Sequence, residues 1–79
     1  MRLTYDPAAD ALYLYLTDRA SGASEVARTK EAAEGLMLDY DAEGRVIGVE
    51  ILAVSSRPGA NPMQMAFEVL TADREAEAA

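Results

Sequence analysis

The sequence predicts a small α+β domain: an antiparallel β-meander sheet of four or five strands, with one C-terminal helix packed on one face. Three observations lead to this prediction. Residues 11–16 alternate between the two faces of a strand, residues 35–52 form two apolar runs around a short turn, and residues 61–70 carry apolar side chains at helical spacing. The length of 79 residues suits a single domain, predicted here over residues 1–71, with residues 72–79 as a frayed or disordered acidic tail.

The first hairpin is predicted from residues 2–16. Arg2–Tyr5 alternates polar and apolar residues, and Pro7 with its neighbouring aspartates favours a turn. The run Ala11–Leu16 then alternates leucine and tyrosine, so both faces of this strand are apolar. A loop over residues 7–10 sets Tyr5 opposite Leu12 and Leu3 opposite Leu14. The leucines then face the helix, and Tyr13 and Tyr15 face the other way.

Residues 18–34 carry the weakest pattern. Small polar residues and Gly22 predict a loop over residues 18–24, and residues 25–29 are interpreted as a third strand through Val26. A helix over residues 24–33 is the alternative, since Ala, Glu, Arg and Lys dominate there. The strand is favoured because that helix would have only Val26 to bury.

The central hairpin turns at residues 41–44, where Asp and Gly suit a hairpin loop. This turn sets Tyr40 opposite Arg45, and the next pairs on the same face are Leu38 with Ile47 and Leu36 with Val49. A slip by one residue would mix Glu50 and Gly48 into the apolar face, so the hydrophobic pattern excludes it.

The helix is predicted after a linker at residues 55–59. Asn61 is a favoured N-cap, and Pro62 suits the first helical position. Met63, Ala66, Phe67 and Leu70 then form one stripe, which is expected to pack on the leucine side of the sheet.

Three pieces of the sequence resemble a known family. They are residues 5–13 (YDPAADALY), residues 38–41 (LDYD) with Gly44, and residues 46–52 (VIGVEIL). Together they resemble domain-of-unknown-function family 2283, the YuzE-like small bacterial and archaeal proteins, over roughly residues 1–55. The resemblance implies a compact, strand-rich domain and supplies no catalytic residue.

Composition narrows the classes of function. Fourteen acidic and seven basic residues leave a formal net charge of −7, which opposes binding to nucleic acid and favours solubility or a basic protein partner. The sequence contains no cysteine and no histidine, and no apolar run is long enough to span a membrane. We therefore expect a cytoplasmic protein without a membrane segment, stabilised by good packing or by self-association.

Carboxylates near the turn suggest two kinds of chemistry. Asp39, Asp41 and Glu43, with Gly44 and Glu50, approach the spacing of a calcium loop, but strands flank the loop and Glu50 lies several residue pairs away. Asp39 and Glu50 also share a predicted face with the tyrosines, an arrangement that acid–base catalysis can use. Without histidine no mechanism stands out, so the protein is predicted to be neither an enzyme nor dependent on a cofactor or metal.

The leading interpretation is a non-enzymatic, self-associating interaction module, most simply a homodimer. An exposed apolar patch that contains tyrosine and methionine is typical of a contact surface. The predicted interface residues are Tyr13, Tyr15, Met37 and Val46. The alternatives are an acidic, antitoxin-like regulator that binds a basic protein, and a carboxylate-based enzyme or metal site.

Overall fold

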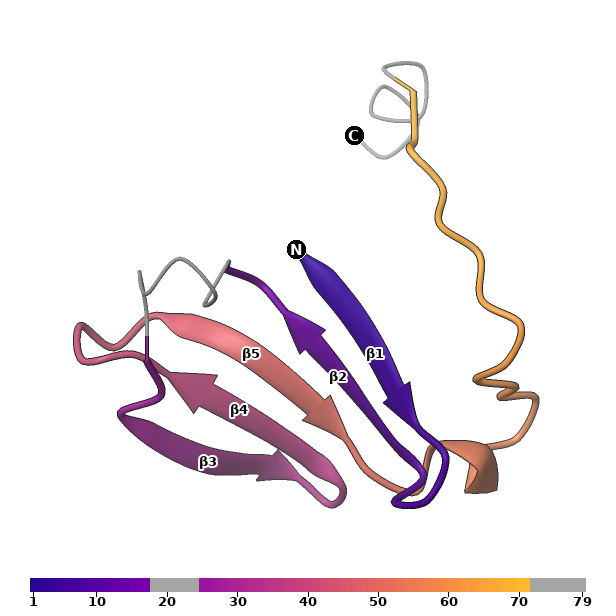
Figure 1. Cartoon of the computed structure of the whole chain (residues 1–79), viewed down its shortest axis with the longest axis horizontal. Coiled ribbons are helices and arrows are strands. Elements are labelled where there is room, and N and C mark those ends of the chain that lie inside the picture. The colour runs from indigo at the N-terminus through magenta and orange to yellow at the C-terminus, as the bar shows by residue number, and fades with distance from the viewer. Residues whose placement is uncertain (18–24, 72–79) are drawn as a thin grey trace.

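The computed structural model describes residues 1–17 and 25–71, and its five strands form one antiparallel sheet (Figure 1). The order across the sheet is β1-β2-β5-β4-β3, and a short 3-10 turn, η2 (Val54–Ser56), follows the last strand. The strands are β1 (Arg2–Asp6), β2 (Ala11–Tyr15), β3 (Arg28–Ala33), β4 (Leu36–Tyr40) and β5 (Val46–Ile51). The predicted loop at residues 18–24 and the predicted tail at 72–79 lie outside the described residues.

The predicted α+β class is wrong, because the described residues contain strands and the η2 turn but no α-helix. The expected N-cap contact does form: the Met63 backbone N–H donates to Asn61 Oδ1 at 3.1 Å. The turn ends there, and residues 65–70 have no regular secondary structure. Short helices gain most of their stability from tertiary packing, and this segment has none, since Met63, Phe67 and Leu70 of the predicted stripe are all exposed.

The predicted meander order is also wrong at one step. The hairpin β1-β2 and the three-stranded unit β3-β4-β5 lie side by side, joined through β2 and β5. As a result, β3 lies at the far edge of the sheet (Figure 1). The sequence of β3, Arg-Thr-Lys-Glu-Ala-Ala, is fully exposed. Charged residues suit an edge strand, whereas the apolar β5 has a neighbour on each side.

The register of the first hairpin is confirmed. Tyr5 pairs with Leu12 and Leu3 pairs with Leu14.

The third strand exists, but it begins at Arg28 rather than at Glu25, and Val26 lies outside it. The alternative of a helix over residues 24–33 is wrong where β3 is described.

The predicted register of the central hairpin is wrong by two residues. Tyr40 pairs with Val46 rather than with Arg45, which accounts for one residue of the shift. The β-bulge between Asp39 and Tyr40 adds the second, so that Leu38 pairs with Val49 and Leu36 with Ile51. The turn itself is where the sequence indicated: Gly44 donates its N–H to the Asp41 carbonyl, and the Asp41 N–H donates to the Arg45 carbonyl. The extra residue is Ile47, which is 1% exposed and is the largest fully buried side chain described. A shift of two leaves leucine and isoleucine on their predicted face.

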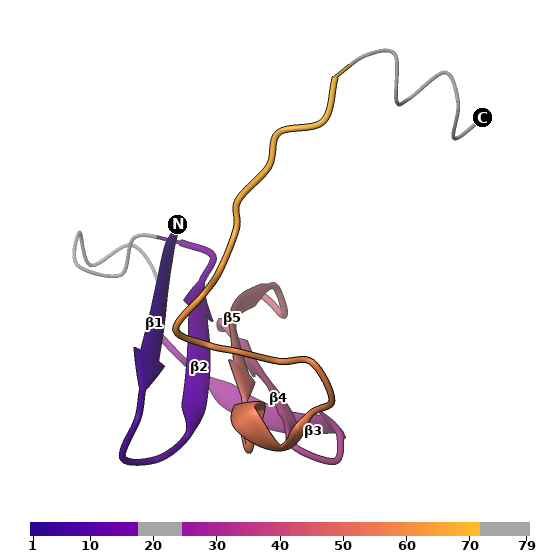
Figure 2. The same cartoon turned by 90° about the vertical axis from the view of Figure 1, so that its right-hand side faces the viewer.

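The core of the described residues is very small. Only three apolar residues are buried, namely Ala11, Ile47 and Val54. No helix covers either face of the sheet in the described part of the chain (Figures 1 and 2). Nor does any helix there have the length and apolar character needed to cross a bilayer.

Candidate functional site

The strand pairing divides the side chains between two contrasting faces. Residues that pair directly across strands share a face, and residues alternate along each strand. One face, which we call the tyrosine face, carries Arg2, Thr4, Tyr13, Tyr15, Met37, Asp39, Gly48 and Glu50. The other, which we call the leucine face, carries Leu3, Tyr5, Leu12, Leu14, Leu36, Leu38, Tyr40, Val49 and Ile51.

A hydrogen-bond network lies at the centre of the tyrosine face. The Tyr13 hydroxyl on β2 donates to Asp39 on β4, and the Thr29 hydroxyl on β3 donates to the other carboxylate oxygen. Between β2 and β4 lies Gly48 of β5, and a Cβ at this position would come within 2.7 Å of Tyr13 Cζ and still closer to the hydroxyl. Glycine is therefore required at residue 48, because the Tyr13 ring crosses β5 over its backbone.

The predicted interface residues do not all share a surface. Tyr13, Tyr15 and Met37 lie on the tyrosine face, where the two tyrosine rings contact each other with centroids 4.5 Å apart. Val46 pairs with Tyr40 beyond the bulge, so it belongs with the opposite row of side chains. Arg2 adds a contact that the sequence pattern did not indicate, with its guanidinium 4.2 Å from the centroid of the Tyr15 ring.

The two faces also differ in charge. Each of the four carboxylates in the described strands lies on the tyrosine face, namely Asp6, Glu31, Asp39 and Glu50. Among the strand residues of the leucine face, charge occurs only on the β3 side, where Arg28 and Lys30 pair with Tyr40 and Leu38. At the opposite edge the Asp10 carboxylate lies against the Tyr5 hydroxyl. The Arg28 guanidinium lies 4.5 Å from the centroid of the Tyr40 ring. The leucine face is therefore apolar with a cationic margin, in a chain whose net charge is −7.

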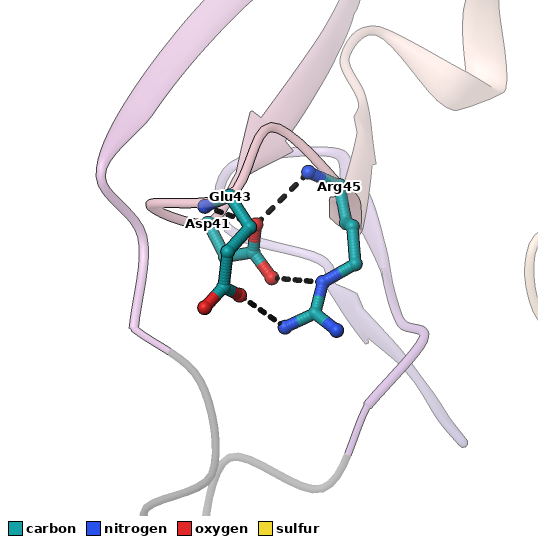
Figure 3. Close-up of polar contacts among 3 residues, drawn as sticks. All are labelled: Asp41, Glu43 and Arg45. Carbon is teal, nitrogen blue, oxygen red and sulfur yellow. Dashed lines mark hydrogen bonds and ion pairs between the residues drawn. The ribbon is translucent and has the colours of Figure 1, made fainter.

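The turn carboxylates that resemble a calcium loop are held by an arginine (Figure 3). Asp41 is 6% exposed and accepts hydrogen bonds from the backbone N–H groups of Glu43 and Arg45, at 3.0 and 2.9 Å, and from Arg45 Nε at 2.7 Å. Glu43 accepts from the same guanidinium. Asp39 points instead to the tyrosine network, so the three candidate ligands are divided between two sites. Among residues 1–17 and 25–71 no group of three potential metal ligands is found.

These bonds shift the ionisation of the turn. The backbone N–H of Arg45, the Arg45 side chain and the Glu43 N–H all stabilise the ionised carboxylate, so the pKa of Asp41 is lowered from its ordinary value. The carboxylate in turn raises the pKa of Arg45. The pair stabilises the turn and leaves little room for a cation.

Asp10 has a structural role beyond its predicted place in the loop at residues 7–10. It has a positive φ of 50°, and its carboxylate accepts hydrogen bonds from the Tyr5 hydroxyl at 2.6 Å and from the Ser55 backbone and side chain. The hydrogen bond from Tyr5, followed by that from Ser55, lowers the pKa of Asp10. Asp10 thus holds η2 against the β1–β2 turn. In the sequence, only the two aspartates on either side of Pro7 indicated that this turn carries a structural carboxylate.

Beyond η2 the chain forms an extended arm, which we define as residues 61–71. Phe67 is 92% exposed and Val69 81%, and Met63, Met65 and Leu70 are also exposed. In both views the arm lies on the β1 side of the sheet and extends beyond it (Figures 1 and 2). Large apolar side chains exposed in this way indicate a surface that another group covers.

The fold and its faces define a class: an all-β protein made of one five-stranded antiparallel sheet, with a polar network on one face and an apolar surface on the other. Within this class the chain belongs to the family described as a protein of unknown function, DUF2283, whose model matches residues 2–55. The match confirms the resemblance seen in the sequence, and it covers the five strands but not the arm. Comparison with curated proteins and with solved structures gives no significant match.

Proposed function

We propose that the protein is a non-enzymatic interaction module that forms a homodimer through its leucine face. The observation that carries this proposal is the apolar face itself, on which nine large side chains lie and no α-helix packs in the described chain. A domain of this size buries only about 60% of the surface that its unfolded chain exposes, so its stability is marginal and further packing stabilises it. A second copy supplies an apolar surface of the same shape, as a two-fold interface requires.

Charge supports the leucine face rather than the tyrosine face as the contact surface. Two acidic chains repel each other wherever carboxylates meet, and all four strand carboxylates lie on the tyrosine face. The polar groups of that face also satisfy one another, as Tyr13, Asp39 and Thr29 do. Packing leucine faces together keeps these carboxylates apart and buries apolar surface.

A matched pair of substitutions tests the proposal. Val49 lies at the centre of the leucine face and pairs with Leu14 and Leu38, while its neighbour Glu50 points to the tyrosine face. Val49→Gln should raise the dimer dissociation constant by about 100-fold, since the cost of a buried polar group falls on both copies. Glu50→Gln should leave it unchanged. Sedimentation equilibrium measures both, with far-UV circular dichroism as the check on folding.

Two results would count against the proposal. A 79-residue chain that stays monomeric across micromolar concentrations excludes the homodimer. Tyr15→Glu is the counterpart on the other face: if it disperses the dimer while Val49→Gln does not, the contact surface is the tyrosine face.

A further inference from the structure

We propose that the arm of each copy docks beside β1 of a second copy, as an added strand that extends the partner's leucine face. This inference rests on the proposed homodimer and names a second contact within it. The occupant of the β1 edge is thus residues 63–69 of the other chain.

The sequence of the arm suits a strand. Met63, Met65, Phe67 and Val69 occupy alternate positions, and Gln64, Ala66 and Glu68 lie between them. This period of two places the four large apolar side chains in one row of an extended segment. The same residues also contain a helical stripe, but residues 65–70 are not helical, so the alternating row is the relevant one. Met63 lies in the turn at the start of the arm and would join this row when the arm docks as a strand.

The β1 edge suits such a strand on both of its faces. β1 is an outer strand of the sheet, so one side of its backbone has no neighbouring strand in the described residues. Its leucine-face residues are Leu3, which is 46% exposed, and Tyr5. Its tyrosine-face residues include Arg2, whose cation suits Glu68 of the arm. An arm strand that puts its apolar row beside Leu3 therefore puts Glu68 on the face of Arg2.

The arm is also long enough and correctly placed for a second copy. Seven extended residues span about 23 Å, more than the about 17 Å of the five-residue β1. Local bonds hold the root of the arm at the end of β5: Arg57 donates to the carbonyls of Leu52 and Ala53, and Ala60 N–H donates to the Arg57 carbonyl. From this root the arm extends past the end of β1, where a second copy can reach it (Figures 1 and 2).

The size of the interface favours the same arrangement. Five strands spaced about 4.8 Å apart, each about 17 Å long, give the leucine face a projected area of about 400 Å². A standard interface buries about 800 Å² per partner. Reciprocal arms add contact area on both copies, and they cover Met63, Phe67 and Val69, which are among the most exposed apolar side chains of the described chain.

The first test removes the apolar row. The double substitution Met65→Ser with Phe67→Ser should raise the dissociation constant of the full-length dimer by at least about 100-fold, because each copy loses two anchoring side chains. Ala66→Ser, on the opposite row, is the matched control and should leave it unchanged. These side chains are exposed, so circular dichroism of the monomer should not change. An unchanged dissociation constant in the double variant overturns the docking of the arm while the leucine-face dimer stands.

The second test uses engineered disulfides to ask whether the arm docks on its own sheet or on that of a second copy. The chain has no cysteine, so no native thiol competes with the engineered ones. An equimolar mixture of Leu3→Cys and Phe67→Cys chains should form mixed disulfide dimers on mild oxidation, whereas a mixture of Leu3→Cys with Gly59→Cys should not. A chain that carries both Leu3→Cys and Phe67→Cys should also cross-link between copies. If that double variant forms only an internal disulfide, the arm folds onto its own sheet and the inference is wrong. A monomeric wild-type chain would exclude the homodimer itself.

Discussion

Gly48 provides the sharpest test of the sheet packing. A Cβ at this residue would meet the Tyr13 ring, which crosses β5 to donate a hydrogen bond to Asp39. Gly48→Ala must therefore lift the ring and break that hydrogen bond. A hydrogen bond to a charged group contributes about 1.5–3 kcal/mol, and replacing glycine by alanine in a strand regains about 0.5–1 kcal/mol. We expect a net loss of about 1.5 kcal/mol in the free energy of unfolding.

The assay is urea or thermal unfolding followed by far-UV circular dichroism. In a domain of this size the expected loss lowers Tm by about 6–12 °C. Protein concentration must be held constant, since association makes Tm depend on it. Tyr13→Phe measures the loss of the hydroxyl alone and should account for much of the effect.

A double-mutant cycle tests whether the Tyr13 ring is the reason that residue 48 must be glycine. In a Tyr13→Leu background no ring crosses β5, so Gly48→Ala should cost nothing there and should become slightly stabilising. An equal loss in both backgrounds would show that the Tyr13 ring is not what requires glycine at residue 48.

The remaining predictions concern three turns. Asp41→Asn should lower stability at pH 7 and flatten its decline in acid. Hydrogen bonds from Arg45 lower the folded pKa of Asp41, so its stabilisation is present above the unfolded pKa of about 3.9 and is lost as the pH falls through the folded pKa. Urea midpoints between pH 7 and pH 2 measure this, and the same slope in wild type and variant would contradict it. Asp10→Ala should lower the midpoint more than Asp10→Asn, because asparagine keeps an acceptor for Tyr5 and tolerates a φ of 50°; equal losses would refute this ranking. Gly44→Ala should cost about 1 kcal/mol, since Gly44 has a φ of 83° in the hairpin turn. Gly59→Ala is the control, because Gly59 has a similar φ of 75° but lies beyond the sheet, and it should leave the unfolding midpoint unchanged. An equal loss of stability in both variants would show that the position of Gly44 in the hairpin turn is not the cause.

Much of the sheet could be predicted because its signals are local. Alternation along β2 placed leucines and tyrosines on opposite faces, and the β1–β2 register followed from a short turn. The candidate carboxylates could also be identified from the sequence, but their hydrogen-bond partners could not. The bond from Arg45 to Asp41 forms once the turn closes, whereas the bond from Thr29 to Asp39 depends on which strand lies beside β4.

The sequence alone was enough to predict where the chain turns and which side chains share a face, except for Val46 beyond the bulge, because period two and turn chemistry are properties of a few consecutive residues. Three features depended on tertiary structure. The turn and the bulge at Ile47 each shift the central hairpin by one residue, and a pattern of period two cannot detect the combined shift of two. The order β1-β2-β5-β4-β3 depends on long-range pairing. Residues 65–70 are not helical because a short segment becomes helical only when a packed surface stabilises it, and the apolar side chains of this segment are exposed.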